Sequence, residues 1–331
     1  MAGARKLLFS VFPLALLALT CELAFGFLGM PEAPVGQHFE HNEIYWVADS
    51  ELKVAPFAHR EVGGAFDVST NADGLRASSH AREKPDDVYR VLILGCSTTF
   101  GWGVGDDETY PAVTQRIFEE RGVKNVEVIN GGQPGYTSFQ GLWFYENVGR
   151  MYDADLVLFG FVVQDARRAA YSDRSQALLQ ADARFLKQKL LYRLRSYRML
   201  KQWIDKRRIA KKERPEEGDQ GVYRVPPEDY VANIRAMKDM VDADGGNLFL
   251  FGFPLERAGY TELHRRILAA AAEELEVPIL DAQENMDVES RERTLFFPQD
   301  RGHANAEGHA LIGEWLATHL QTRGFVKAST P

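Results

Sequence analysis

Residues 90–104 read RVLILGCSTTFGWGV, and this stretch decides the fold. The apolar run from Val91 to Leu94 ends at Gly95, a pattern typical of a buried central strand that enters a tight turn. Strands of this kind belong to open parallel sheets, where chemistry occurs at the carboxyl ends of the strands. Ser97 therefore stands where a nucleophile is expected, provided that the chain supplies its partners.

From Tyr89 onward, strand patterns alternate with helix patterns. We predict strands at 91–94, 126–129, 156–161, 248–253 and 277–280. We predict helices at 109–122, 138–151, 227–241 and 260–275, and a last helix that starts near residue 305. This alternation, with right-handed crossovers, predicts a three-layer, doubly wound α/β fold with a central parallel sheet.

The N-terminal segment, residues 1–30, has the pattern of a membrane-targeting sequence. Arg5 and Lys6 precede an apolar run of about 20 residues, long enough to span a bilayer. The segment is therefore either a single signal anchor or a signal peptide cleaved near Ala24-Phe25-Gly26. A lipoprotein attached at Cys21 and a buried helix are further alternatives. Because basic residues next to a membrane segment stay in the cytoplasm, we expect a single-pass protein whose main domain is extracytoplasmic. Cleavage of the segment would instead give a secreted or periplasmic protein.

Two further segments lie outside the alternating pattern. Residues 31–87 carry only short strand-like pieces, at 43–47 and 65–68, and are predicted to form a stalk and an extension packed on the main domain, residues 88–325. Residues 169–221 form a helical insertion rich in Arg and Lys. The insertion is either a solvated helix pair, or a lid or a face attracted to anionic lipid or acidic polymer.

Composition and motifs exclude several classes of function. A net charge of −8 gives no support for nucleic-acid binding by the whole chain. Cys21 and Cys96 make no disulfide framework, and no Cys-x-x-Cys or His/Cys cluster indicates a metal site. Thr99 replaces the last glycine of a Gly-x-Ser-x-Gly elbow, and Trp102 follows Gly101 where a phosphate-binding loop needs lysine.

Two polar positions follow the second and third predicted strands. Gly135, in the loop 130–137, is placed to aim its N–H at a ligand, and Gln164 supplies a primary amide directly after strand 156–161. Each of them alone also fits an ordinary loop residue. Together they lie at the same predicted sheet edge as Ser97.

The loop before the last helix carries a candidate base. His303 is the natural base at neutral pH, and Asp300, three residues earlier, can orient its ring so that the other ring nitrogen serves Ser97. His309 is a competing base, although it falls inside the last predicted helix. Asp165 is an alternative acid.

At this point the chain resembles the SGNH/GDSL hydrolase superfamily of lipases, esterases and acyltransferases. The resemblance runs from about Tyr89 to Leu320. The blocks of that family occur in the order Ser, Gly, Asn and Asp-x-x-His. Here they are Gly95-Cys96-Ser97, Gly135, Gln164, and Asp300-x-x-His303 with Asn305 and Gly308 after it. The resemblance implies a flavodoxin-like sheet of strand order 2-1-3-4-5, and ester hydrolysis or acyl transfer through an acyl-serine.

The resemblance also implies a role for each site residue. Ser97 would be the nucleophile, His303 the base and Asp300 the orienting acid, while the N–H groups of Ser97 and Gly135 and the Gln164 side chain would form the oxyanion hole. No cofactor is implied. External placement favours an ester-bearing small molecule, a glycan or a lipid of the cell envelope as substrate. An envelope acyltransferase, or a non-catalytic glycan-binding or assembly protein, remains the alternative.

The sequence departs from the family pattern at two positions. Cys96 replaces the aspartate of the usual Gly-Asp-Ser, which is not the acid of the triad, so a small neutral residue is expected to pack beneath the turn. Gln164 replaces the usual asparagine and keeps the amide donor, but one methylene further out. We expect either that the loop retracts by about one C–C bond length or that the oxyanion hole is weaker.

Overall fold

The computed structural model describes residues 13, 16–17, 19–28, 55–59, 64–77, 81–169, 172–175, 177, 194–197, 199–200, 203, 221–298 and 300–327. It forms two units: residues 1–37 with 177–220, and residues 38–176 with 221–331. The second unit contains the central sheet and every candidate site residue. The predicted strand at 43–47 and most of the basic insertion lie outside the described residues.

The first unit joins a part of the N-terminal segment to a part of the insertion. Residues 19–27 are helical, and the carboxylate of Glu22 accepts the backbone N–H groups of Arg195 and Ser196, each at 2.8 Å. A carboxylate at the start of a helical turn is favoured because the turn's first N–H groups have no other partner. Among the described residues, no helix has both the length and the apolar character of a membrane span.

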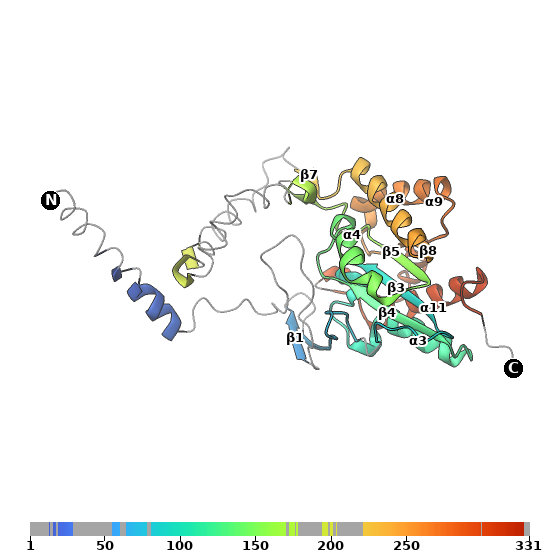
Figure 1. The fold of residues 1–331 in the computed structure, drawn as a ribbon, viewed down its shortest axis with the longest axis horizontal. Coiled ribbons are helices and arrows are strands. Elements are labelled where there is room, and N and C mark those ends of the chain that lie inside the picture. Colours follow the sequence, from blue (N-terminus) through green and yellow to red (C-terminus); the bar gives the residue numbers. More distant parts are fainter. Residues whose placement is uncertain are drawn as a thin grey trace. The chain divides into compact units, whose positions relative to one another are not determined.

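Five parallel strands make the central sheet of the second unit (Figure 1). They are, in chain order, β3 (Tyr89–Gly95), β4 (Val126–Gly132), β5 (Leu156–Gly160), β8 (Asn247–Gly252) and β9 (Ile279–Asp281). Their order across the sheet is β4-β3-β5-β8-β9, which confirms the expected order 2-1-3-4-5. The middle strands are mostly apolar because helices cover both faces of the sheet.

The helices that cover the sheet lie on opposite faces (Figure 1). On one face are α3 (Tyr110–Glu120) and α11 (Ala306–Thr322), and on the other are α4 (Ser138–Asn147), α8 (Pro227–Ala243) and α9 (Glu262–Glu274). Strand β3 serves both layers, because Val91 and Ile93 pack with the first pair while Leu92 and Leu94 pack with the second group. The three-layer α/β/α architecture is therefore confirmed.

The remaining elements are short. Three antiparallel strand pairs are β1 (Ala55–His59) with β2 (Gly64–Val68), β6 (Arg168–Ala169) with β7 (Val222–Tyr223), and β10 (Phe296–Phe297) with β11 (Asp300–Ala304). The short helices are α2 (Ser97–Phe100) and α10 (Gln283–Glu289), and the 3-10 turns are η2 (Asp106–Glu108), η3 (Gly149–Tyr152) and η4 (Ala258–Thr261). Two details differ from expectation. Helix α4 ends at Asn147 rather than at residue 151, because the turn η3 follows it, and Asp300 begins a strand rather than lying in a loop, because that segment pairs with β10.

A row of three glycines crosses the carboxyl edge of the sheet. Gly95 of β3 is in register with Gly132 of β4 and Gly160 of β5. A Cβ on Gly132 would collide with the backbone of Phe100, and one on Gly160 would collide with the carbonyl of Leu94. The short helix α2 therefore rests directly on the sheet, and this close approach requires glycine.

Candidate active site

Ser97 is the first residue of helix α2, directly beyond the end of β3. It is 7% exposed, and its carbonyl accepts the N–H of Gly101, which closes the helix in the left-handed conformation at φ 83°. As the first helical residue, Ser97 has a backbone N–H without a partner in the helix. Cys96 lies beneath the turn, with Sγ 3.3 Å from Thr98 Oγ1, and burial raises its pKa, so the thiol stays neutral.

His303 and Asp300 reach this serine from strand β11. His303 Nε2 lies 2.8 Å from Ser97 Oγ, and its Nδ1 contacts the Asp300 carboxylate. Asp300 also accepts the N–H of Gly302 at 3.1 Å. With Nδ1–H donating to the carboxylate, Nε2 is left as the acceptor for the serine hydroxyl. The structure thus brings together the three residues that the sequence predicted as nucleophile, base and acid.

The end of β11 is fixed by the residues that follow it. Asn305 is the N-cap of α11, where its side chain accepts the N–H of Gly308 at 2.9 Å and donates to the carbonyl of Thr294 at 2.7 Å. Gly308 has no room for a Cβ, which would meet the carbonyl of Leu295. These contacts anchor His303 between the hairpin and the helix, as a precise base requires.

The competing base and the alternative acid are both buried and pack as core residues. His309 is buried in α11, its Nδ1 accepts the N–H of Tyr110 at 3.1 Å, and burial lowers its pKa to about 3. It is therefore a neutral core residue. Asp165 is fully buried and accepts the N–H of Ser138 at the start of α4 at 2.9 Å, while burial raises its pKa to about 7. The residue in contact with the ring of His303 is Asp300, not Asp165.

Gly135 and Gln164 belong to the segments that follow the glycine row. Because Gly95, Gly132 and Gly160 are in register, the three segments beyond them leave the sheet at one level. Gly135 follows within the loop after β4 and has φ +80°, a conformation that favours glycine. Gln164 follows β5 and is half-buried. Both lie at the carboxyl edge that carries the serine turn.

Arg224 joins these two residues, although no sequence motif marks it. Its Nη1 donates to the carbonyl of Gly135 at 2.8 Å and to Gln164 Oε1 at 3.2 Å. The guanidinium is held in turn by Asp173, with Nε to Oδ1 at 3.0 Å and Nη2 to Oδ2 at 2.8 Å. In the sequence it is one arginine between apolar residues at the end of a segment already rich in Arg and Lys, so it does not stand out.

A second arginine near the site, Arg76, lies on the extension before the sheet. Its side chain is fully buried, and Nη1 donates to the carbonyls of Phe100 and Gly101 at 2.6 and 2.5 Å. Nη2 donates to the carbonyl of Val104 at 2.5 Å, and Nε pairs with Asp106 at 2.9 Å. Arg76 therefore fixes the C-terminal end of α2 and the loop after it.

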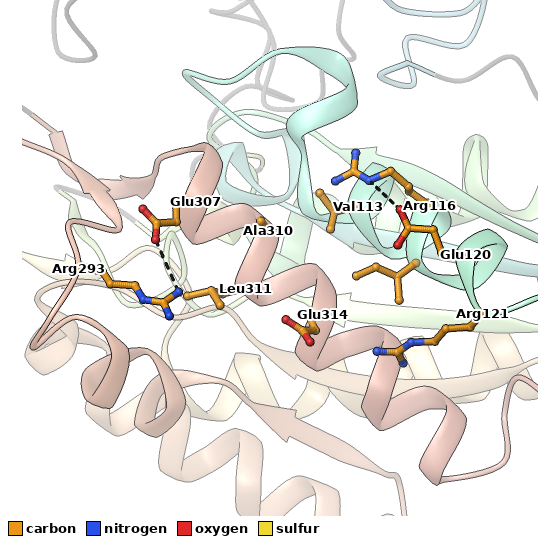
Figure 2. Close-up of a pocket in the computed structure, with 10 residues that line it drawn as sticks. Val113, Arg116, Glu120, Arg121, Arg293, Glu307, Ala310, Leu311 and Glu314 are labelled. Atoms are coloured by element: carbon orange, nitrogen blue, oxygen red, sulfur yellow. Dashed lines mark ion pairs between the residues drawn. The ribbon is translucent and has the colours of Figure 1, made fainter.

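A hollow elsewhere on this unit lies between α3 and α11 (Figure 2). Its apolar lining includes Val113, Ile117 and Leu311, and charged residues such as the pair Arg116 and Glu120 rim it. None of its lining residues belongs to the candidate site, so it carries no argument about the reaction.

The site has the parts that nucleophilic acyl transfer needs. A hydroxyl is hydrogen-bonded to an imidazole whose other nitrogen contacts a carboxylate. Three donors stand at the same edge: the N–H groups of Ser97 and Gly135, and the amide of Gln164, none with an acceptor among the described residues. The described ranges contain no group of three or more His, Cys, Asp or Glu side chains arranged to bind a metal ion.

Comparison with known proteins finds similar solved structures and one matching family. A lipase/acylhydrolase from Enterococcus faecalis has a TM-score of 0.50 and 15% identity, over 74% of this chain and 100% of that chain. An acetyl xylan esterase from Geobacillus stearothermophilus has a TM-score of 0.47 and 15% identity, over 76% of this chain and 100% of that chain. No curated protein matches. A sequence model of the GDSL-like lipase/acylhydrolase family matches residues 93–311, more than half of the chain, which therefore belongs to this family of carboxylic ester hydrolases.

Proposed function

We propose that the protein removes an acyl or acetyl group from a polysaccharide or lipid of the cell envelope, through an acyl-Ser97 intermediate. The observation that carries the catalytic part is the contact of 2.8 Å between His303 Nε2 and Ser97 Oγ, together with the contact between Asp300 and the other ring nitrogen. Membership of the acylhydrolase family supports the same reaction class.

The first half of the reaction forms the acyl-enzyme. Ser97 Oγ attacks the ester carbonyl carbon while its proton passes to His303 Nε2, and Asp300 stabilises the imidazolium that results. When the tetrahedral intermediate collapses, the alkoxide of the leaving alcohol takes that proton from His303. The acyl group then remains bonded to Ser97 as an ester.

The second half repeats these steps with water. His303 accepts a proton from a water molecule that attacks the acyl-serine, and the carboxylic acid leaves as Ser97 takes the proton back. In both halves the developing oxyanion is bound by the N–H groups of Ser97 and Gly135 and by the amide of Gln164. Donors aimed at this charge are worth ~10²–10³ in rate each.

The substrate class rests on the N-terminal segment. A basic pair followed by an apolar run supports export or anchoring with the site outside the cytoplasm, where O-acylated glycans and lipids occur. We therefore place the protein at the cell membrane with its catalytic domain on the extracytoplasmic side. A secreted or periplasmic protein would meet the same substrates.

Acyl transfer is the second candidate function, because the same acyl-enzyme can be resolved by a sugar hydroxyl instead of water. Both reactions start from the contact between Ser97 and His303. A non-catalytic glycan-binding protein would keep the fold without turnover, so it would bind a glycan but leave esters intact.

Ester turnover by the full chain tests this function. We expect wild-type protein to hydrolyse short-chain aryl esters and to release acetate from O-acetylated glycans, and Ser97→Ala to do neither. Adding an acceptor glycan separates the two reactions, since a transferase would form more acylated glycan than free acid. Equal hydrolysis by wild type and Ser97→Ala would overturn the proposal.

A further inference from the structure

We propose that Arg224 is a positioning residue of this site, which turns the Gln164 amide and the Gly135 peptide toward the oxyanion. The inference rests on the proposed function, because it assigns a task within the same reaction. It comes from one cation that contacts both of these residues: Arg224 Nη1 lies 2.8 Å from the carbonyl oxygen of Gly135 and 3.2 Å from Gln164 Oε1.

The contact with Gln164 decides which end of its amide faces the substrate. A primary amide has an acceptor end and a donor end, and a guanidinium carries only donors. Arg224 therefore selects the orientation in which Oε1 points to the cation and Nε2 points away from it. Without the cation, rotation about the last side-chain bond would also present Oε1 to the reaction centre, where it would repel an oxyanion instead of binding it.

The same contact gives a reason for glutamine at this position. The amide oxygen of an asparagine would lie about 1.5 Å, one C–C bond, closer to the backbone. Since Gln164 Oε1 is already 3.2 Å from Arg224 Nη1, the shorter side chain would lose this hydrogen bond. The extra methylene of Gln164 is therefore matched to Arg224.

The contact with Gly135 fixes the second donor. Gly135 is in the left-handed conformation at φ +80°, and its N–H has no acceptor within the described part of the chain. A glycine is held in this conformation by its contacts, because it has no side chain to restrict it. The hydrogen bond from Arg224 to the Gly135 carbonyl supplies that restraint.

Arg224 is itself held rigidly enough to act in this way. Its side chain is 19% exposed and forms a two-point ion pair with Asp173, whose side chain is 2% exposed. Nη2 also donates to Gln140 Oε1 at 3.1 Å, and Thr137 donates its hydroxyl to Asp173 at 2.7 Å. Two-point arginine–carboxylate pairs fix direction as well as distance, so the guanidinium is aimed before substrate arrives.

A double-mutant cycle between Arg224 and Gln164 tests the assignment, with kcat and KM for an aryl ester as readouts. We expect Arg224→Met to lower kcat roughly 10- to 100-fold, with KM changed less than about threefold, because the loss falls in the transition state. In a Gln164→Ala background the same substitution should lower kcat several-fold less, since part of its effect passes through Gln164. Arg224→Lys should recover part of the loss, because it keeps a cation but not the two-point geometry.

Arg90→Met is the matched control, since Arg90 is a buried arginine at the opposite, amino end of β3. Its Nε donates to Glu127 at 2.8 Å and its Nη1 to the carbonyl of Tyr152 at 2.7 Å. It should lower the melting temperature without changing kcat. If Arg224→Met does not fold, the cycle is run with Arg224→Lys.

The outcomes separate this inference from the proposed function. The positioning role would be overturned if the losses in kcat from Arg224→Met and Gln164→Ala multiplied in full in the double variant. It would also be overturned if Arg224→Met left kcat unchanged, and in both cases Ser97→Ala would still abolish turnover. Turnover that survives Ser97→Ala would instead overturn the proposed function, and the positioning role with it.

Discussion

The two sides of the site are built in different ways. On the nucleophile side, Ser97, His303 and Asp300 contact one another directly. On the oxyanion side, Gly135 and Gln164 are each held by a third residue, Arg224. The first side is a chain of mutual hydrogen bonds. The oxyanion side is a pair of donors held by Arg224, which need not touch the substrate itself.

This difference shows how a site tolerates sequence change. Members of the nucleophile side depend on one another, so none can be exchanged without losing the function of the others. A donor on the oxyanion side needs only to deliver an N–H to one point in space. On the proposal made for Arg224, glutamine can therefore stand in for asparagine at position 164 when a support of the right length is present.

The largest effect should come from breaking the nucleophile side. We expect Ser97→Ala and His303→Ala each to lower kcat/KM roughly 10⁴- to 10⁶-fold, and the double variant to be no worse than either alone, because the two residues act as a unit. Ester hydrolysis kinetics check this. Losses that multiply in the double variant would show that the two residues act independently.

Asp300→Asn should follow, with a loss of about 10⁴-fold in kcat. The amide keeps the shape of the carboxylate, but it can present a donor to Nδ1 and so favour the tautomer in which Nε2 carries the proton. That tautomer cannot accept the proton of Ser97. Steady-state kinetics between pH 6 and 9 measure the effect, and a loss below tenfold would assign the orienting role to another group.

The oxyanion side should give smaller losses. We expect Gln164→Ala to lower kcat ~10²- to 10³-fold, the usual value for one oxyanion donor. Gln164→Asn should also be slower than wild type, at least tenfold, because its amide oxygen no longer reaches Arg224. A faster Asn variant would instead mean that the long side chain impairs the oxyanion hole, and would remove the purpose assigned to Arg224.

Arg76→Met tests the support behind the nucleophile turn. Removing this buried cation takes a donor from the carbonyls of Phe100, Gly101 and Val104 and breaks the ion pair with Asp106, so we expect a loss of about 3 kcal/mol in the free energy of unfolding. Urea denaturation measures it. Arg82→Met, which breaks the ion pair of an arginine that is 55% exposed, should change far less. Equal losses would mean that Arg76 is no special support.

The smallest effect concerns Asp165, beside the oxyanion donor. Burial raises its pKa from 3.8 to about 7, so the folded state holds a proton that the unfolded state releases. Stability should therefore fall as pH rises from about 4 to 7, by roughly 2 kcal/mol between pH 5 and 7. Asp165→Asn should lack this slope. Urea denaturation of both proteins at pH 5, 6, 7 and 8 measures the free energy of unfolding. The same pH dependence in both proteins would show that Asp165 does not titrate between pH 5 and 8.

The sequence predicted those parts of the molecule whose cause is local. Strand 91–94 is apolar on both faces, and the helix after Thr109 carries its own N-capping residue, so the alternation of strands and helices predicted the three layers, whereas the strand order was implied by the family resemblance. Ser97, Gly135, Gln164, Asp300 and His303 were predicted at one sheet edge because each follows a strand or precedes the last helix.

The supports escaped prediction because their partners are distant in sequence. Arg224 is 60 residues from Gln164, and Arg76 is 24 residues from Phe100, so no short motif links either pair. The hairpin that carries Asp300 was also missed, because β10 has only two residues, too few to show a strand period. Helix α2, with four residues, is likewise below the length at which helical periodicity appears.

The measurement that tests the central claim most directly is covalent labelling with a fluorophosphonate, read by mass spectrometry of the digested protein. The account predicts one adduct, on Ser97, formed by the wild type, absent in Ser97→Ala and much slower in His303→Ala, because only the His303-activated hydroxyl attacks phosphorus. Labelling of another residue, or a labelling rate that does not depend on His303, would contradict it.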